Sequence, residues 1–241
     1  TTSGNLATMA AYDDSFNGGE TDLFVAKLDP TPDLIYSTYL GGAGKDWTGE
    51  NFHSIAIDAS GLIYVTGITS STYFTGTQEY GYDKICGGAV SCTTSQPDGI
   101  IAVLDPTEEG EDGLLYASYL GGNGIDQGKT VSVDGDGKVY VAGLTFEGDL
   151  DAIYGTCTGS AGASFVASID PTKVYTESLV YMACIYATDV WEITTDISGT
   201  IYLTGEAFQG LPLTPDALDT TVEPGYSDAF LTVLNPEGNS L

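Results

Sequence analysis

The chain has 241 residues and 42% of them are hydrophobic, so it is long enough for one large domain or two small ones and too apolar for a disordered chain. It carries 34 acidic residues against six lysines and no arginine, which gives a formal net charge of −28. A surface this negative repels phosphate backbones and anionic membranes, and no apolar run approaches the roughly 20 residues of a membrane span, so we expect neither nucleic-acid binding nor membrane insertion.

The first elements predicted along the chain are short strands rather than helices. Valine, isoleucine, tyrosine, phenylalanine and threonine dominate these runs, whereas glycine, proline and aspartate separate them. The segment Asp58-Ala-Ser-Gly61 is typical of a hairpin turn. Earlier in the chain, Asp29-Pro30 ends the predicted strand FVAKL. The first four predicted strands are FVAKL (24–28), YSTYL (36–40), IAID (55–58) and IYVTG (63–67).

These strands return at regular spacing. The motif FVAKLDP (24–30) recurs as IIAVLDP (100–106), SFVASIDP (164–171) and AFLTVLNP (229–236). The turn-containing motif SIAIDASGLIYVTG ends at Gly67, and its two relatives end at Gly143 and Gly205. YSTYLGG (36–42) recurs as YASYLGG (116–122) and, in a decayed form, as VYMACIY (180–186). Four short antiparallel strands in each repeat describe the blades of a β-propeller, in which neighbouring blades cover the faces that one blade cannot bury alone.

The motifs FVAKLDP, YSTYLGG and IAIDASGLIYVTG resemble the SBBP, or β-propeller, repeat of secreted and surface proteins of bacteria and archaea. The resemblance implies an all-β fold, namely a partial β-propeller of about three to four four-stranded antiparallel blades. By analogy with related propellers, the IAID strand would be innermost and the YSTYL strand outermost. We expect one propeller region, 1–241, with units at approximately 1–43 (a partial blade), 44–122, 123–186 and 187–241 (a partial blade). About thirteen strands do not close a ring of seven or eight blades, so we expect the chain to be part of a longer polypeptide.

Four cysteines are present: Cys86, Cys92, Cys157 and Cys184. An even number of cysteines in an acidic, lysine-poor chain favours disulfides and an oxidising compartment. Cys92 and Cys157 each stand thirteen residues before the anchor aspartate of their repeat, which favours a structural role. The connectivity is not fixed by the sequence, but we expect Cys86–Cys92 to close an inserted loop and Cys157–Cys184 to tie a loop to a strand.

Asp134 and Asp136 are the candidate metal ligands, in the segment Asp134-Gly-Asp-Gly137. Their spacing resembles half of a calcium-binding loop, although the further oxygen ligands of such a loop are missing. The alternative is turn chemistry, in which the first aspartate accepts hydrogen bonds from backbone amides and the glycine adopts a positive φ. Calcium at this turn is the only cofactor that we consider.

Other residues have a chemical and a structural interpretation. Tyr36, Tyr39, Tyr116 and Tyr119 could form a platform for sugar rings, but repeated aromatic residues in strands favour packing between blades. Asp46, Asp126 and Asp189 recur in the same place in each unit, as expected for a fold element rather than an active site. The segment Gly121–Thr130 resembles a phosphate-binding loop, but a strand follows it where that loop requires a helix.

We therefore expect a secreted or cell-surface module without catalytic residues. It would act in adhesion, in assembly of filaments or a surface layer, or in scaffolding, and would contact a protein, a polysaccharide or other copies of itself. The variable segment Gly76–Ser95 is the expected contact surface, because loops carry recognition while repeated strands carry packing. The alternative is a carbohydrate-binding or carbohydrate-active propeller, which would need paired carboxylates beside lysine or histidine.

Overall fold

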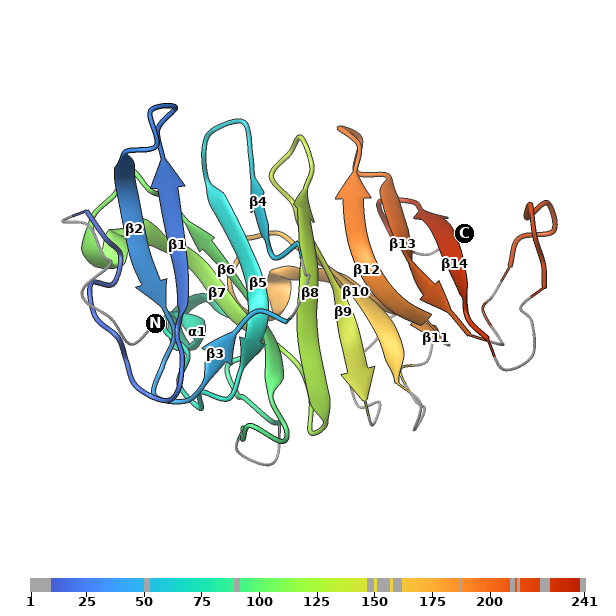
Figure 1. Ribbon diagram of the computed structural model, residues 1–241, viewed down its shortest axis with the longest axis horizontal. Coiled ribbons are helices and arrows are strands. Elements are labelled where there is room, and N and C mark those ends of the chain that lie inside the picture. The colour runs from blue at the N-terminus through green and yellow to red at the C-terminus, as the bar shows by residue number, and fades with distance from the viewer. Residues whose placement is uncertain are drawn as a thin grey trace.

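The computed structural model describes residues 10–49, 53–88, 92–146, 150, 157, 162–186, 188–208, 211, 213–221 and 226–238. In this part of the chain four antiparallel sheets stand side by side, like the blades of a partial propeller (Figure 1). The predicted fold class is therefore confirmed, and the sheets form an open row rather than a closed ring.

The first sheet contains β1 (Leu23–Leu28) and β2 (Leu34–Leu40). The second contains β3 (Asp46–Trp47), β4 (Ile55–Ile57), β5 (Ile63–Thr69), β6 (Asp98–Leu104) and β7 (Leu114–Leu120), with β3 and β4 both paired to β5. The third contains β8 (Ile125–Val133), β9 (Val139–Phe146), β10 (Ala163–Ile169) and β11 (Leu179–Tyr186). The fourth contains β12 (Thr188–Thr195), β13 (Ile201–Ala207) and β14 (Asp228–Leu234).

A repeated aspartate shapes the hairpin turns β4–β5, β8–β9 and β12–β13 of the last three sheets. Asp58 Oδ1 accepts the backbone N–H groups of Ser60 and Leu62, both at 2.9 Å. Gly61 follows with a φ of +93°, a conformation that a glycine adopts without steric cost. Asp134 and Asp196 make the corresponding contacts in the next two sheets, so the Asp-x-x-Gly pattern was a correct turn prediction.

The strands that lead into these turns, β4, β8 and β12, contact one another, as the innermost strands of a propeller should. The backbone N–H of Val131, on β8, donates to the carbonyl of His53, just before β4, at 3.2 Å. On the other side of β8, the Ser132 hydroxyl lies 2.9 Å from the hydroxyl of Thr195 on β12. The sheets therefore converge along β4, β8 and β12 (Figure 1).

Hydrophobic residues form three cores, one at each junction between neighbouring sheets. In the first core, Val25 of the first sheet packs with Ile100 and Leu104 of the second. In the second core, Ile101 and Val103 of the second sheet pack with residues of the third, and the third core joins the third and fourth sheets in the same way. Because successive residues of a strand point to opposite faces, each inner sheet contributes to two cores.

The tyrosines of the outermost strands belong to this packing. Tyr36, Tyr39, Tyr116 and Tyr119 are all buried, so none of them offers a ring to a sugar. The third copy of the motif begins one residue later than predicted: Tyr181 pairs with Ser168 as Tyr116 pairs with Val103. Cys184 therefore occupies the position of Tyr119.

Helices are few and short. The described residues contain α1 (Thr77–Tyr80) and two 3-10 turns, η1 (Gly110–Gly113) and η2 (Tyr175–Glu177). None of the described helices has the length and the apolar character needed to cross a membrane.

Candidate functional site

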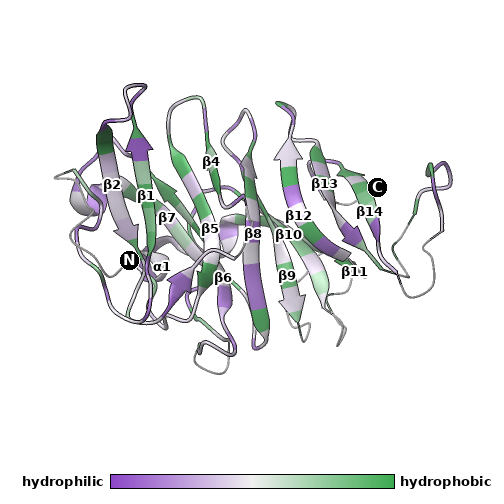
Figure 2. Cartoon of the chain, viewed as in Figure 1, coloured by the Kyte–Doolittle hydropathy of each residue, from purple (hydrophilic) through white to green (hydrophobic). Residues whose placement is uncertain are grey.

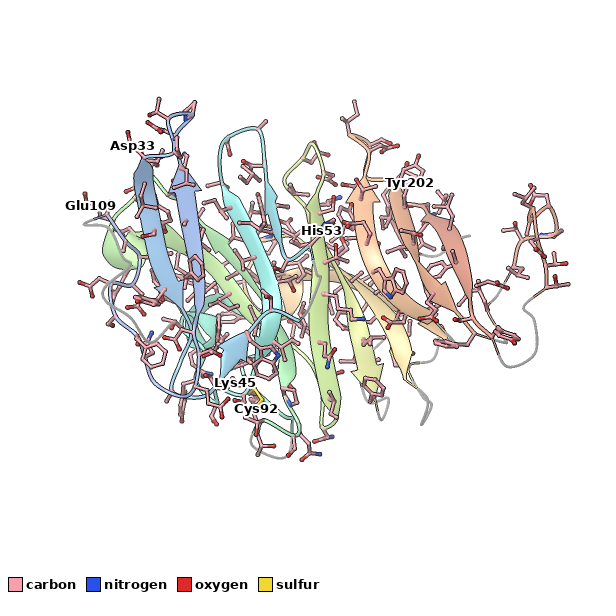
Figure 3. The ribbon with its side chains drawn as sticks, viewed as in Figure 1. Asp33, Lys45, His53, Cys92, Glu109 and Tyr202 are labelled. Carbon is pink, nitrogen blue, oxygen red and sulfur yellow. A yellow bond between two sulfur atoms is a disulfide. The ribbon has the colours of Figure 1, made fainter. Side chains whose placement is uncertain are left out.

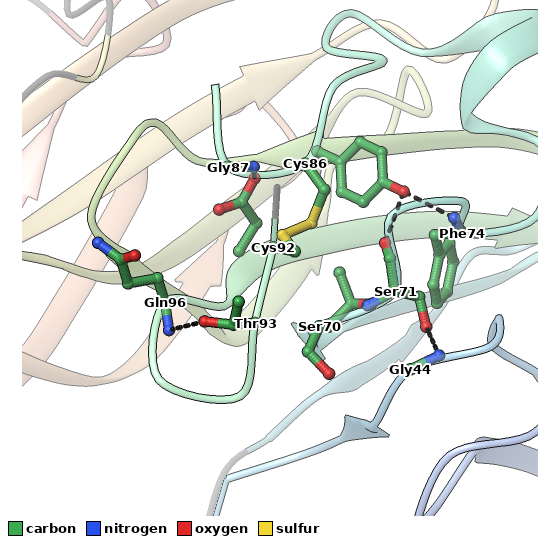
Figure 4. Close-up of a disulfide and its surroundings, with 12 residues drawn as sticks. Gly44, Ser70, Ser71, Phe74, Cys86, Gly87, Cys92, Thr93 and Gln96 are labelled. Carbon is green, nitrogen blue, oxygen red and sulfur yellow. Dashed lines mark hydrogen bonds between the residues drawn. A yellow bond between two sulfur atoms is a disulfide. The ribbon is translucent and has the colours of Figure 1, made fainter. Parts of the chain in front are cut away.

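The connection between β5 and β6 is the candidate interaction loop, and the structure describes its residues 70–88 and 92–97. The expected contact surface Gly76–Ser95 belongs to it, except that residues 89–91 lie outside the described residues. This loop is much longer than a tight turn between two strands, and it includes α1 and one disulfide. Its first residues lie over the junction between the first two sheets. There the Ser70 hydroxyl accepts the backbone N–H of Lys45 at 2.8 Å. The Ser71 hydroxyl accepts the backbone N–H of Gly44 at 2.9 Å (Figure 4).

The side chain of Tyr119, on β7, forms two hydrogen bonds with the start of the loop. Its hydroxyl donates to the carbonyl of Ser71 at 2.9 Å and accepts the backbone N–H of Phe74 at 2.6 Å (Figure 4). Burial raises the pKa of Tyr119 to about 12, against the opposing effect of the Phe74 amide, so the phenol stays neutral and keeps its donor proton. A buried side chain of the scaffold thus fixes the start of the loop.

The middle of the loop covers the outer edge of the second sheet. Asp83 forms an isolated bridge with Tyr119, and its backbone N–H donates to the Ser118 hydroxyl at 3.0 Å. An uncovered edge strand offers unpaired backbone groups to other chains, so this contact protects β7.

The disulfide Cys86–Cys92 closes the far part of the loop, as expected from the sequence. Next to it, the backbone N–H of Gly87 donates to Asp98 Oδ2 at 2.8 Å. The two sulfur atoms and the Asp98 carboxylate lie within 4.8 Å of one another, but bonded sulfurs are not the thiolates that bind metals. The group is therefore a structural anchor.

Two apolar side chains of this anchored loop face solvent. Tyr73 is 74% exposed and Ile85 is 63% exposed. Between them in sequence, the Lys84 ammonium lies 3.7 Å from the centroid of the Tyr175 ring, which links the loop to the third sheet. Figure 3 places Cys92 at the lower end of the molecule, away from the hairpin turns at the upper end.

The second disulfide, Cys157–Cys184, also has the expected pairing. Cys184 lies on β11, and Cys157 belongs to the connection between β9 and β10, of which the structure describes only Leu150, Cys157 and Gly162. Both disulfides thus attach a strand connection to the propeller scaffold.

Asp46 and Asp126 occupy equivalent positions at the start of β3 and in β8. In the sheets, Asp46 pairs with Thr69 and Asp126 pairs with Thr145. The carboxylate of each aspartate also accepts a backbone N–H at 2.9 Å, from Gly42 and Gly122 respectively. Burial raises the pKa of Asp46, although hydrogen bonds from Thr69, Gly42 and Ser71 oppose the rise. These aspartates are fold elements, as expected.

The expectation that Asp189 is their third equivalent is wrong. In β12 the residue at this register is Thr188, which pairs with Ala207. Asp189 is one residue further along, and a shift of one residue turns a side chain to the opposite face of a sheet. The same number of residues, seventeen, separates Asp126 from Gly143 and Thr188 from Gly205, so the sequence held the signal.

On that opposite face the structure assembles charges that sequence reasoning missed. The buried ammonium of Lys129, at a β-bulge of β8, donates to Asp189 Oδ1. Nearby, the exposed ring of His53 contacts Glu192 Oε2, and the Thr130 hydroxyl donates to Glu192 Oε1 at 3.2 Å. Figure 3 shows His53 at the centre of the molecule, beside β8. Segment 121–130, which resembled a phosphate loop, ends in this strand.

Asp134 and Asp136 lie in the turn between β8 and β9. Asp134 Oδ1 accepts the backbone N–H groups of Asp136 and Lys138 at 2.9 and 3.0 Å, and its Oδ2 accepts the Tyr140 hydroxyl at 2.9 Å. Across the described ranges, no third histidine, cysteine or acidic side chain joins these two as a ligand set. The observed contacts are those of the turn, and calcium binding stays a prediction.

Residues 115–151 match the family model of the SBBP repeat, a beta-propeller repeat. The matched segment begins in β7 and includes the Gly121-Gly122 step, β8 and β9, so it crosses from one blade to the next. No curated protein matches the chain. The predicted resemblance is confirmed, and the chain carries an SBBP β-propeller repeat.

Proposed function

We propose that the chain is a non-catalytic module of a secreted or cell-surface protein and that its loop 70–97 binds a protein or polysaccharide partner. One observation carries this proposal. The loop is fixed by Tyr119 and by the disulfide Cys86–Cys92, yet it presents Tyr73 and Ile85 to solvent. An aromatic residue on a fixed loop gives contact area at a low cost in backbone conformational entropy, as binding surfaces require.

Composition supports an extracellular location. Two disulfides fit a secreted protein, because reducing compartments keep thiols free. The net charge of −28 also favours neutral or cationic partners over anionic ones.

Binding of the purified chain to cell envelopes of the organism that encodes it tests the proposal. We expect Tyr73→Ala combined with Ile85→Ala to weaken binding at least about 10-fold, the effect of losing a small hot spot. Ile197→Ala combined with Leu218→Ala is the matched control, since both side chains are fully or almost fully exposed elsewhere. Equal binding by the loop variant and the wild type would contradict the proposal.

A carbohydrate-active propeller is the second candidate, and the charges along the innermost strands favour it. Asp189 and Glu192 come from one strand and lie beside Lys129 and His53, which is the type of set that glycoside chemistry uses. The test is release of reducing ends from a polysaccharide panel, with Asp189→Asn and Glu192→Gln as variants. Release that both substitutions abolish would favour this candidate, and no release from any polysaccharide would exclude it for that panel.

A further inference from the structure

Two buried aspartates lie beside each other at the junction between the first and second sheets. Asp22, just before β1, is 6% exposed, and Asp46, at the start of β3, is fully buried. Both carboxylates point at the position that a β-carbon of Gly41 would occupy, with Asp22 Oδ1 at 3.0 Å and Asp46 Oδ2 at 2.8 Å from it. The backbone N–H of Asp46 donates to the carbonyl of Thr21 at 2.8 Å, which joins the two segments that carry the aspartates.

The pair has hydrogen-bonding partners but no positively charged side chain bound to it among the described residues. Three neutral donors reach the Asp46 carboxylate: the backbone N–H of Gly42 and the hydroxyls of Ser71 and Thr69. The backbone N–H of Asn17 donates to Asp22 Oδ2 at 2.7 Å, whereas Asp22 Oδ1 is buried and accepts no hydrogen bond from the described part of the chain. Because burying carboxylates without a counter-charge is costly, a ligand that supplies positive charge binds favourably at such a position.

The second junction has aspartates at the same two positions. Asp98 and Asp126 hold them, because the backbone N–H of Asp126 donates at 2.9 Å to the carbonyl of Pro97, the residue before Asp98, as in the first pair. Both aspartates are fully buried. The hydroxyl of Thr145, the strand partner of Asp126, is buried too and has no hydrogen bond with the described residues. Figure 2 shows hydrophilic residues at β3 and in the lower half of β8, the strands that carry one aspartate of each pair.

The third junction shows that neighbouring sheets pack without these acids. Ala163 and Thr188 occupy the two positions there, and Tyr186, the strand partner of Ala163, replaces the first glycine of the Gly-Gly pair. Ala163 and Thr188 are buried, and the core between the third and fourth sheets forms beside them. The two acids and the glycine are thus present together at two junctions and replaced together at the third. This pattern indicates one unit whose acids do more than pack the sheets.

We propose that each acidic pair binds a calcium ion between two sheets. Calcium takes oxygen ligands, above all carboxylates and water, in flexible geometry, and two carboxylates balance its double charge. At the first junction Asp22 Oδ1 and the Asp46 carboxylate are ligands. At the second, Asp98 and Asp126 take their place, with the Thr145 hydroxyl as a further oxygen ligand. This inference depends neither on the loop surface nor on the turn that the sequence predicted as a calcium site.

Titration calorimetry with calcium chloride tests the proposal on the EDTA-treated 241-residue chain, at about pH 7 and in about 150 mM salt, which screens diffuse binding to the acidic surface. We expect the wild type to bind one calcium ion at each pair. Asp22→Asn and Asp126→Asn should each lose one of these ions, and the double variant should lose both. Glu109→Gln, at an exposed position, is the matched control and should keep both. Asp134→Asn with Asp136→Asn should keep both as well.

Thermal unfolding separates a lost site from a misfolded variant. Calcium should raise the unfolding midpoint of the wild type, since a ligand of the folded state stabilises it, and should leave the midpoint of the double variant unchanged. In EDTA the double variant should unfold at a midpoint no lower than that of the wild type, because its neutral amides need no counter-charge. A wild type without saturable calcium binding would overturn the proposal, and a proton would then be what relieves the repulsion between the carboxylates. Asp22→Asn and Asp126→Asn variants that bind as many ions as the wild type would overturn it too.

Discussion

Asp22 and Asp46, from neighbouring sheets, point their carboxylates at one position beside Gly41. A β-carbon on Gly41 would lie 3.0 Å from Asp22 Oδ1 and 2.8 Å from Asp46 Oδ2. Both aspartates are buried, Asp22 just before β1 and Asp46 at the start of β3. At the next junction, a β-carbon on Gly121 would lie 2.6 Å from Oδ1 of the buried Asp98. The first glycine of each Gly-Gly pair thus leaves room for buried carboxylates.

Replacing either glycine by alanine should destabilise the fold. Gly41→Ala and Gly121→Ala put a methyl group against buried carboxylates, and overpacking of this kind costs about 1–3 kcal/mol of unfolding free energy. Ala43→Ser adds an atom at an exposed position two residues from Gly41 and should change stability by less than about 0.5 kcal/mol. Chemical denaturation measures both, and equal effects would show that space at Gly41 does not matter.

The same junction should make stability depend on pH. Burial raises the pKa of Asp22 to about 6; the Asn17 amide opposes this rise, and the Asp46 charge adds to it. The folded state therefore disfavours the charged carboxylate, so this group lowers stability above pH 6 and ceases to do so as the pH falls towards 4. At about 1.4 kcal/mol per pKa unit, the penalty at pH 7 is at most about 3 kcal/mol.

Asp22→Asn isolates this contribution, because the amide oxygen can still accept the N–H of Asn17. Unfolding free energies of the variant and the wild type should differ most at pH 7, with the variant more stable, and should converge towards pH 4. The comparison removes the opposite effect of Asp58 and Asp196, whose pKa values lie below the usual range and whose contributions are lost in acid. A difference that is the same at all pH values would contradict the assignment.

The two disulfides should contribute unequally to stability. They span 6 and 27 residues, and closure of loops of these lengths corresponds to about 2 and 3.5 kcal/mol in the chain-entropy account. Cys157→Ala with Cys184→Ala should therefore lower the unfolding free energy more than Cys86→Ala with Cys92→Ala. Thermal or denaturant unfolding of the two double variants decides this, and the reverse order would contradict it.

Local patterns in the sequence predicted the strands and the turns at Asp58, Asp134 and Asp196, whereas the cysteine pairing was expected without being fixed by the sequence. The patterns did so because side-chain alternation and turn chemistry depend on residues close together in the chain. The misplacement of Asp189 has a different origin. The strand motif is displaced by one residue in this unit, which the seventeen-residue spacing from Thr188 to Gly205 marks and the pairing of Thr188 with Ala207 shows.

The candidate sites could be predicted only in part. The contact surface was expected at the variable segment Gly76–Ser95, which leaves out Tyr73, and the anchor Tyr119 looked like any other packing tyrosine of the repeat. The pair Lys129–Asp189 joins residues sixty positions apart and depends on a bulge in β8, which no local pattern marks. Such contacts follow from how the sheets pack.

That packing is the central claim, and one matched pair of leucines tests it most directly. Leu28 and Leu104 hold the same repeat position, but Leu28 is 56% exposed while Leu104 is fully buried under the neighbouring sheet. In the monomer, Leu104→Ala should lower the unfolding free energy by about 2–5 kcal/mol and Leu28→Ala by less than about 1 kcal/mol. Equal losses for the two substitutions would mean that the sheets do not cover one another face to face.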